Sequence, residues 1–226
     1  MLAVIFAIVT AGHHAPEGRA DARTDLAAEG VRLARMLFDL MPDEPECAGV
    51  LALALATEAR RDARFDGEGD IVLLADQDRS KWQHDEIEAA KRLLIEASRR
   101  GRPGPYQLQA MIACIHGSAS VATDTDWAQI ANLYRVLEEM NPTAVVRVNR
   151  AVAVAEAQGA DVALSLLEDV DLDVVGGWHL YWSTLGELLR REGRVDEARV
   201  AFDRALGCSP NDTDRRFLER RRAELA

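Results

Sequence analysis

The sequence is poor in aromatic residues and in positive charge, and each shortage excludes a class of protein. Only 5% of its 226 residues are Phe, Trp or Tyr, although 48% are hydrophobic. Leu, Ala, Val and Ile must therefore fill the core, which favours packed helices over a β-sandwich. The net charge of −11 excludes a protein whose whole surface binds nucleic acid, because phosphates select clustered Lys and Arg. We expect no direct DNA contact from this chain.

Cysteine and histidine are too sparse to build a metal or redox centre. The three cysteines, Cys47, Cys114 and Cys208, are too scattered for a disulfide framework or a zinc site, which predicts a reducing, cytoplasmic compartment. His13 and His14 have no carboxylates at ligand spacing, and no glycine-rich phosphate cradle is present. The sequence predicts no metal, no cofactor and no catalytic nucleophile.

A long apolar run is missing as well. Met1–Val9 is apolar, but no positive segment precedes it and it is too short to span a bilayer. We expect a buried first helix here, without a targeting role and without membrane contact.

The stretch between His179 and Asp212 has the period of a known structural repeat. The 34-residue tetratricopeptide repeat is matched at Trp182, Leu185, Gly186, Gly193, Ala198, Phe202, Ala205 and Pro210, while Leu189 replaces its usual aromatic residue. Gly186 is expected to let the second helix of the repeat pack closely, with Phe202 filling the gap. One repeat cannot bury its own apolar face, so neighbouring repeats are expected. Gly159 placed on Gly193 gives the same period.

The remaining apolar patterns predict an all-α fold of stacked antiparallel helix pairs, a tetratricopeptide-like solenoid forming one domain over residues 1–226. The pairs are expected at about 2–41, 44–101, 103–141, 143–169 and 177–208, with a capping helix at 211–225. Thr24 is expected to cap a helix after a loop from His13 to Arg23. Residues 171–177 are expected to form a spacer.

A polar cluster lies in a segment inserted between two helices at about residues 64–83. Its Gly- and Asp-rich turn and the aliphatic run Ile71–Leu74 predict a small hairpin or loop. The cluster itself comprises Asp76, Gln77, Asp78, Arg79 and Trp82. Asp76 and Asp78 could serve as an acid and a base or bind a divalent cation. Alternatively, Arg79 pairs with a carboxylate and Trp82 anchors the insert to the helices. Because no nucleophile or third ligand lies nearby, packing or partner contact is the better interpretation.

The whole chain resembles a known module, the C-terminal extension of a group of bacterial sigma factors of the extracytoplasmic-function class. The matching stretches are Ala28–Leu37, Leu40–Glu46, Ile71–Trp82, Gly101–Ala110 (with Tyr106 and Gln107), Thr125–Trp127 and Val148–Ala155 (with Asn149 and Arg150). The Asp-Gln-Asp-Arg run followed by Trp82 is the most specific of them. Neither promoter-binding domain of such sigma factors is found in these 226 residues.

The resemblance implies a non-enzymatic module that regulates transcription initiation by binding sigma domains or core RNA polymerase. Resemblance to the repeat also places Asn149 and Glu156 in a groove lined by first helices, followed by Ser183, Glu187 and Arg190 in the next pair. We expect the insert around Asp76–Trp82 to pack near that surface and to share in partner binding.

Two other functions stay open. One is a free-standing scaffold that binds an unrelated peptide. The other is a small-ligand or hydrolase-like protein that uses Asp76 and Asp78, with an aromatic wall from Tyr106, Trp82 or Trp127. Such an enzyme needs a closed pocket beside the two carboxylates, and no motif supplies a reaction type.

Overall fold

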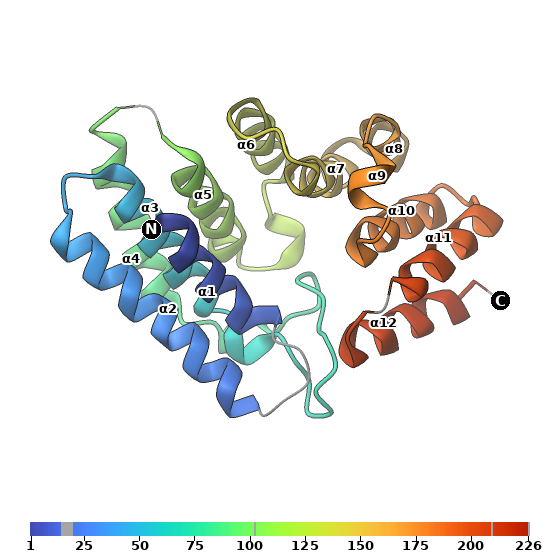
Figure 1. Cartoon of the computed structure of the whole chain (residues 1–226), viewed down its shortest axis with the longest axis horizontal. Coiled ribbons are helices and arrows are strands. Elements are labelled where there is room, and N and C mark those ends of the chain that lie inside the picture. Colours follow the sequence, from blue (N-terminus) through green and yellow to red (C-terminus); the bar gives the residue numbers. More distant parts are fainter. Residues whose placement is uncertain (15–19, 102, 209, 226) are drawn as a thin grey trace. The chain divides into compact units, whose positions relative to one another are not determined.

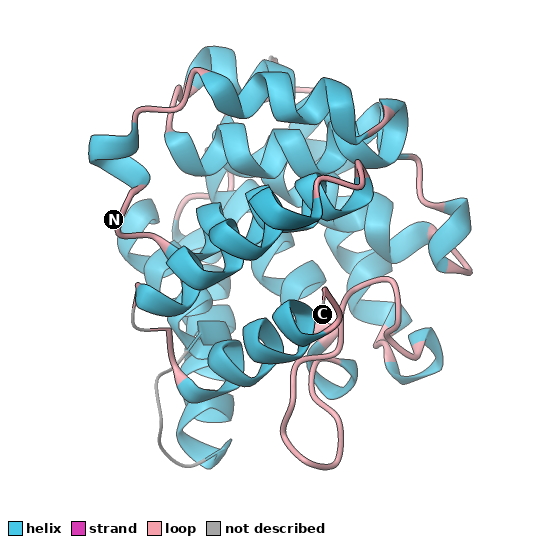
Figure 2. Ribbon diagram, turned by 90° about the vertical axis from the view of Figure 1, so that its right-hand side faces the viewer, coloured by secondary structure: helices cyan, strands magenta, loops and turns pink. Residues whose placement is uncertain are grey.

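The computed structural model describes residues 1–14, 20–101, 103–208 and 210–225, with side chains omitted for 11–25. Over these residues the chain is helical and contains no strand, which confirms the all-α prediction (Figures 1 and 2). The helices are α1 (Leu2–His14), α2 (Ala20–Leu40), α3 (Pro45–Glu58), α4 (His84–Ser98), α5 (Pro105–Ser118), α6 (Trp127–Met140), α7 (Ala144–Gln158), α8 (Ala160–Glu168), α9 (Leu172–Val175), α10 (His179–Arg191), α11 (Val195–Gly207) and α12 (Asp212–Ala223).

The chain groups into two compact units. Unit 1 comprises residues 1–66 and 72–126, and unit 2 comprises residues 67–71 and 127–226. Each unit is described separately below. The single domain over residues 1–226 stays a prediction.

Helix α3 forms the centre of unit 1. Its sequence alternates Leu and Ala with hardly a polar side chain, and every residue from Cys47 to Ala56 is buried. Such a helix has no solvent face, so neighbouring helices must cover it on several sides. Helices α2, α4 and α5 all pack against α3. The core cluster around α3 includes Ala34 and Leu37 of α2, Ala90 of α4 and Ala110 of α5.

The beginning of the chain differs from the prediction in its helix boundaries. Helix α1 continues to His14 and α2 already begins at Ala20, so Thr24 lies inside α2 and does not cap it. Residues 20–23 are Ala-Asp-Ala-Arg, and the Ala and Arg among them favour helix continuation, which outweighs the capping preference of a single Thr. Part of the expected loop, residues 15–19, lies outside the described residues.

The predicted insert is present as a loop between α3 and α4, without paired strands. The N–H of Val72 donates to the carbonyl of Arg64 at 2.9 Å, and only isolated bridge residues, Phe65 and Ile71, stand where strands were expected. Leu74 packs instead on a small buried cluster that includes Trp82 and Ile87. Within this half-buried aliphatic run, Leu74 is the residue that packs on the helices in place of strand pairing.

In unit 2, α10 and α11 form the repeat that the sequence predicts. A Cβ atom on Gly186 would lie 3.1 Å from the ring of Phe202, closer than ordinary van der Waals contact, so glycine favours this close approach. Phe202 is buried, and so is Leu189 at the position usually aromatic. Gly159 and Gly193 both adopt positive φ angles, 112° and 71°, at equivalent inter-helix turns. The expected spacer contains the short helix α9, whose end is tied to α10 because the indole N–H of Trp182 donates to the carbonyl of Gly176 at 2.9 Å.

None of the described helices combines the length and the apolar character that a membrane crossing requires.

Candidate functional site

Arg79 and Trp82 lock the insert onto the helices of unit 1. Trp82 is 3% exposed, and the Arg79 guanidinium stacks over its ring at 4.5 Å. The same guanidinium donates from Nη1 to the carbonyls of His116 and Ala119, both at 2.8 Å, at the C-terminal end of α5. A cation at a helix C-terminus is favoured by the helix dipole. Arg79 therefore binds main-chain carbonyls and makes no ion pair with Asp76 or Asp78 among the described contacts.

The two carboxylates of the cluster have different environments. Asp78 caps the 3-10 turn Arg79–Lys81, because its Oδ1 accepts hydrogen bonds from the Ser80 N–H at 3.0 Å and hydroxyl at 2.6 Å. The Ser80 hydroxyl and N–H bonds lower the pKa of Asp78. Asp76 is exposed, and Gln77 donates to the carbonyl of Val72 at 3.2 Å. Asp78 is engaged in turn formation, and Asp76 is left to face solvent.

Burial shifts the pKa values of two side chains of α5. Burial, followed by the charges of Arg60 and Arg79, lowers the pKa of His116 to about 4. Burial also raises the pKa of the Cys114 thiol to about 11. Near neutral pH these shifts favour a weakly basic imidazole and a protonated thiol, which are a poor general base and a poor nucleophile. No group of three potential metal ligands occurs in the described part of the chain.

Tyr106 and Gln107 begin α5, and their position depends on Glu46 of α3. The Glu46 carboxylate accepts from the Tyr106 N–H at 3.0 Å and from the N–H and side-chain amide of Gln107 at 3.1 Å each. The N-cap residue of α5, Gly104, has no side chain that could do this. A Cβ on Gly49 would lie 2.7 Å from the Gln107 nitrogen. Two of the stretches that carry the family resemblance thus meet at one helix cap.

The groove residues predicted for unit 2 lie in a surface of paired charges. Asn149 is exposed on α7, and Arg150 donates to Glu138 of α6 at 2.7 Å. Arg147 donates to the same carboxylate at 2.6 Å, and the Glu138 side chain is only 11% exposed. Burial raises the pKa of Glu138, but the bonds from Arg150 and Arg147 outweigh burial, so the pKa is lowered.

A second pair of contacts continues this surface onto α10. Arg191 pairs with Glu156 of α7 at 2.6 Å, and Glu187 accepts from Arg190 at 2.7 Å. Ser183 is half-buried on the same helix. Trp127 is half-buried at the start of α6 in unit 2. The structure therefore connects Glu156 with α10, and the acidic groups of this surface are neutralised within the unit.

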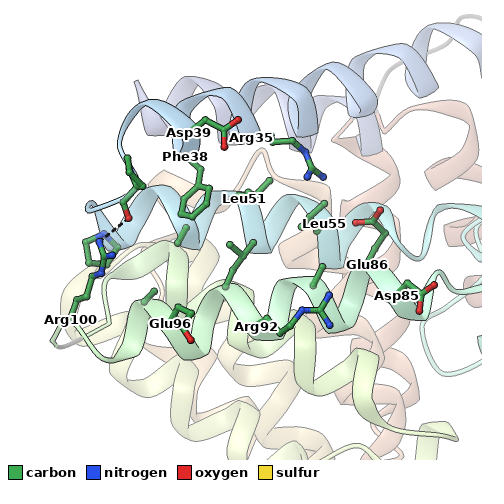
Figure 3. A pocket seen from close by; sticks show the side chains of 16 residues that line it. Arg35, Phe38, Asp39, Leu51, Leu55, Asp85, Glu86, Arg92, Glu96 and Arg100 are labelled. Carbon is green, nitrogen blue, oxygen red and sulfur yellow. Dashed lines mark hydrogen bonds between the residues drawn. The ribbon is translucent and has the colours of Figure 1, made fainter.

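Unit 1 contains a groove that the sequence did not predict. Its volume is about 700 Å³. Figure 3 shows Arg35, Phe38 and Asp39 on α2 at one side, Arg92 and Glu96 on α4 at the other, and Leu51 and Leu55 of α3 between them. The complete lining is Arg35, Phe38, Asp39, Pro42, Pro45, Ala48, Leu51, Leu55, Asp85, Glu86, Ala89, Arg92, Leu93, Glu96, Ala97 and Arg100. We refer to it as the α2–α4 groove.

The sequence contained one signal for the α2–α4 groove. Helix α2 carries Arg35, Phe38 and Asp39 on neighbouring positions of one face, so an apolar side chain is flanked by charges of opposite sign one turn apart. Such a face is ambiguous in a sequence, because a charged flank is usually only a solvated surface. Only the packing of α2 and α4 around α3 turns it into the wall of a groove.

Comparisons with known proteins agree with the helical-repeat architecture. Residues 1–98 match the model of a family of unknown function, DUF6596. The chain is 40% identical over 223 residues to the uncharacterized protein R00370 of Rhizobium meliloti (strain 1021), covering 99% of this chain and 52% of the relative. The chain thus spans about half the length of that relative.

The fold is also similar to that of a solved structure, the thermophilic TPR protein TTC0263 of Thermus thermophilus. The TM-score is 0.60 at 19% sequence identity, over 91% of this chain and 92% of that protein. At this identity the similarity concerns the fold alone. The chain has a TPR-like helical fold.

Proposed function

We propose that this chain is a non-enzymatic module that acts in transcription initiation by binding the promoter-binding domains of a sigma factor or core RNA polymerase. The observation that supports this most is the construction of the insert. Its most family-specific run forms a fixed platform, because Trp82 is buried and Arg79 is bound to α5, while Asp76 remains exposed at the surface. A fixed loop that presents an unengaged charge is suited to recognition, since little ordering is required on binding.

The length of the relative also supports the proposal. About half of the Rhizobium meliloti protein lies outside the matched region, and promoter-binding domains in that region would place a partner on the same polypeptide. Tethering raises the effective concentration of such a partner, so even a weak contact between the two halves would be occupied.

One observation favours a second candidate, a free-standing scaffold that binds an unrelated peptide. The solved TPR protein is matched over 92% of its own chain, so an architecture of this size exists as a separate polypeptide. No comparable observation supports an enzyme that uses Asp76 and Asp78, because Asp78 is committed to capping the turn before Ser80.

The test is a calorimetric titration of this chain with two probes. One probe is the part of the Rhizobium meliloti relative that this chain does not match, expressed separately, and the other is core RNA polymerase. We expect saturable binding to at least one probe, weakened at least tenfold by Asp76→Lys. Glu219→Lys, an equal charge reversal at an exposed position of α12, should leave binding unchanged. Absence of binding to both probes would overturn the proposal in favour of the scaffold.

A further inference from the structure

We propose that the α2–α4 groove is a docking site for an amphipathic α-helix of a protein partner. The occupant has an aliphatic face toward α3 and carries on its flank an acid opposite Arg35 and a base opposite Asp39, one turn apart. This site is separate from the insert, and the inference does not depend on the proposed role in transcription.

The side walls of the groove provide the hydrophobic contact. Leu51, Leu55 and Ala48 of α3 line its floor and are already buried, with Phe38 from α2 and Leu93 from α4 at its sides. Phe38 and Leu93 are only half-buried, so a bound aliphatic side chain would remove more of their surface from water. Removal of apolar surface from water favours association. The groove thus has the apolar base that helix-in-groove recognition uses.

The rim of the groove carries both paired and unpaired charges, since Glu96 and Arg100 pair with Arg99 and Asp43. Within the described residues, the side chains of Arg35, Asp39 and Glu86 form no hydrogen bond or ion pair. Arg35 and Glu86 come from opposite walls, α2 and α4 (Figure 3), yet they do not approach to ion-pair distance. Opposite charges held apart across an apolar floor favour an occupant that brings its own counter-charges between them.

The spacing of these charges matches that of side chains one turn apart on a helical occupant. Arg35 and Asp39 are four residues apart on α2, about 6 Å along a helix axis, which is the spacing of i and i+4 positions on a second helix laid beside it. A helix with a base and an acid at that spacing satisfies both. The acid meets Arg35 and the base meets Asp39.

The length of the groove distinguishes a helix from a small ligand. On α4 the lining runs from Asp85 to Arg100, which corresponds to about 22 Å at 1.5 Å per residue, or roughly four helical turns. The volume of about 700 Å³ alone would fit a drug-sized ligand. The extended lining with charges on both walls fits an elongated, mixed-charge partner better.

The test uses the full chain and two synthetic helical peptides of sixteen residues as probes. Both peptides carry Leu on one face. One has Glu and Lys placed four residues apart to meet Arg35 and Asp39, and the other has Lys at both positions. Fluorescence anisotropy should show the Glu–Lys peptide binding at least tenfold more tightly, whichever way the helix runs. The preference should reverse in Arg35→Glu, which turns two acidic side chains toward the peptide.

Two control variants separate docking in the groove from binding elsewhere. Arg32→Glu changes the same charge on α2 outside the groove lining and should retain the original preference. Ala89→Glu places a charge in the groove lining and should abolish binding of both peptides, with circular dichroism confirming that the helices persist.

Three results would overturn the inference. The first is equal affinity for the two peptides, or a preference that Arg35→Glu leaves unchanged. The second is binding of neither peptide while dodecanoate binds, which would identify a small-ligand site. The third is self-association in sedimentation that Arg35→Glu abolishes, which would make a second copy of this chain the occupant.

Discussion

The α2–α4 groove of unit 1 and the charged surface of unit 2 differ in how their side chains are paired, although unit 1 also contains ion pairs such as Arg61–Glu58. In unit 2, Glu138 of α6 is bound by Arg150 of α7, and Glu156 of α7 is bound by Arg191 of α10. In the α2–α4 groove of unit 1, Arg35 forms no such pair among the described contacts. A surface whose charges are paired internally must break those pairs to bind a partner, whereas unpaired charges beside an apolar floor are ready to accept one.

The largest expected effect tests whether the two units unfold together. Trp82→Ala in unit 1 and Phe202→Ala in unit 2 each remove a large buried side chain and should cost about 3–5 kcal/mol of stability. Since we predict a single domain, each variant should shift one common transition in urea, monitored by circular dichroism. Two separate transitions, of which each variant moves only one, would contradict the single domain. Leu40→Ala, at an exposed position of α2, is the control.

The next effect concerns the buried imidazole of His116 in unit 1. Its pKa is about 4 in the folded chain, lowered from 6.5 by burial and by Arg60 and Arg79. Between these values the unfolded chain binds more protons, so stability present near pH 7 is lost as the pH falls from 6.5 to 4. The loss should be about 3 kcal/mol. Urea unfolding of His116→Asn should show a correspondingly weaker pH dependence. An NMR titration of His116 with a midpoint near 6.5 would contradict the prediction.

A smaller effect compares the two kinds of charge directly. Arg150→Ala leaves the largely buried Glu138 with one fewer donor and should cost about 2 kcal/mol, as for hydrogen bonds to charged groups. Arg35→Ala removes a charge with no pairing contact among the described residues and should change stability by less than about 0.5 kcal/mol. If chemical denaturation showed that both variants lose the same free energy of unfolding, the distinction between paired and unpaired charges would be contradicted.

The smallest effect compares helix caps in the two units. Helix α5 is capped by Glu46 from another helix, whereas α12 is capped by its own Asn211, which accepts from the Asp214 N–H at 2.9 Å. Glu46→Ala and Asn211→Ala should each cost about 1 kcal/mol. Only Glu46→Ala should also increase hydrogen exchange of the Tyr106 amide. Glu44→Ala, two residues before Glu46 and without a capping bond, should change neither stability nor this exchange.

The repeat in unit 2 was the most predictable part of the chain. Gly186 and Phe202 specify a close helix pair through side-chain size alone, and Gly193 specifies the turn through a φ angle that other residues rarely adopt. Such constraints act over a few residues and are therefore visible in the sequence. The start of α2 was less predictable, because helix continuation and capping at Thr24 compete with similar energies.

The insert was predictable in composition and not in its contacts. An Asp-Gln-Asp-Arg run suggests ion pairs between neighbours, but Arg79 binds the carbonyls of His116 and Ala119, which lie 37 and 40 residues away. The pairing of Tyr106 and Gln107 with Glu46 was equally hidden, since it joins residues about 60 positions apart. Contacts at such separations depend on how the helices stack, which a local pattern does not record.

The sequence by itself determined most of the helices, the repeat formed by α10 and α11 and the presence of an insert, because apolar periodicity and glycine positions act locally. The tertiary structure alone decided which charges are paired. Glu138 and Arg35 are both charged residues on amphipathic helices. Glu138 is bound by two arginines, whereas Arg35 lines an open groove. Ion pairing depends on distances of a few ångströms between helices, and those distances are set only when the helices pack.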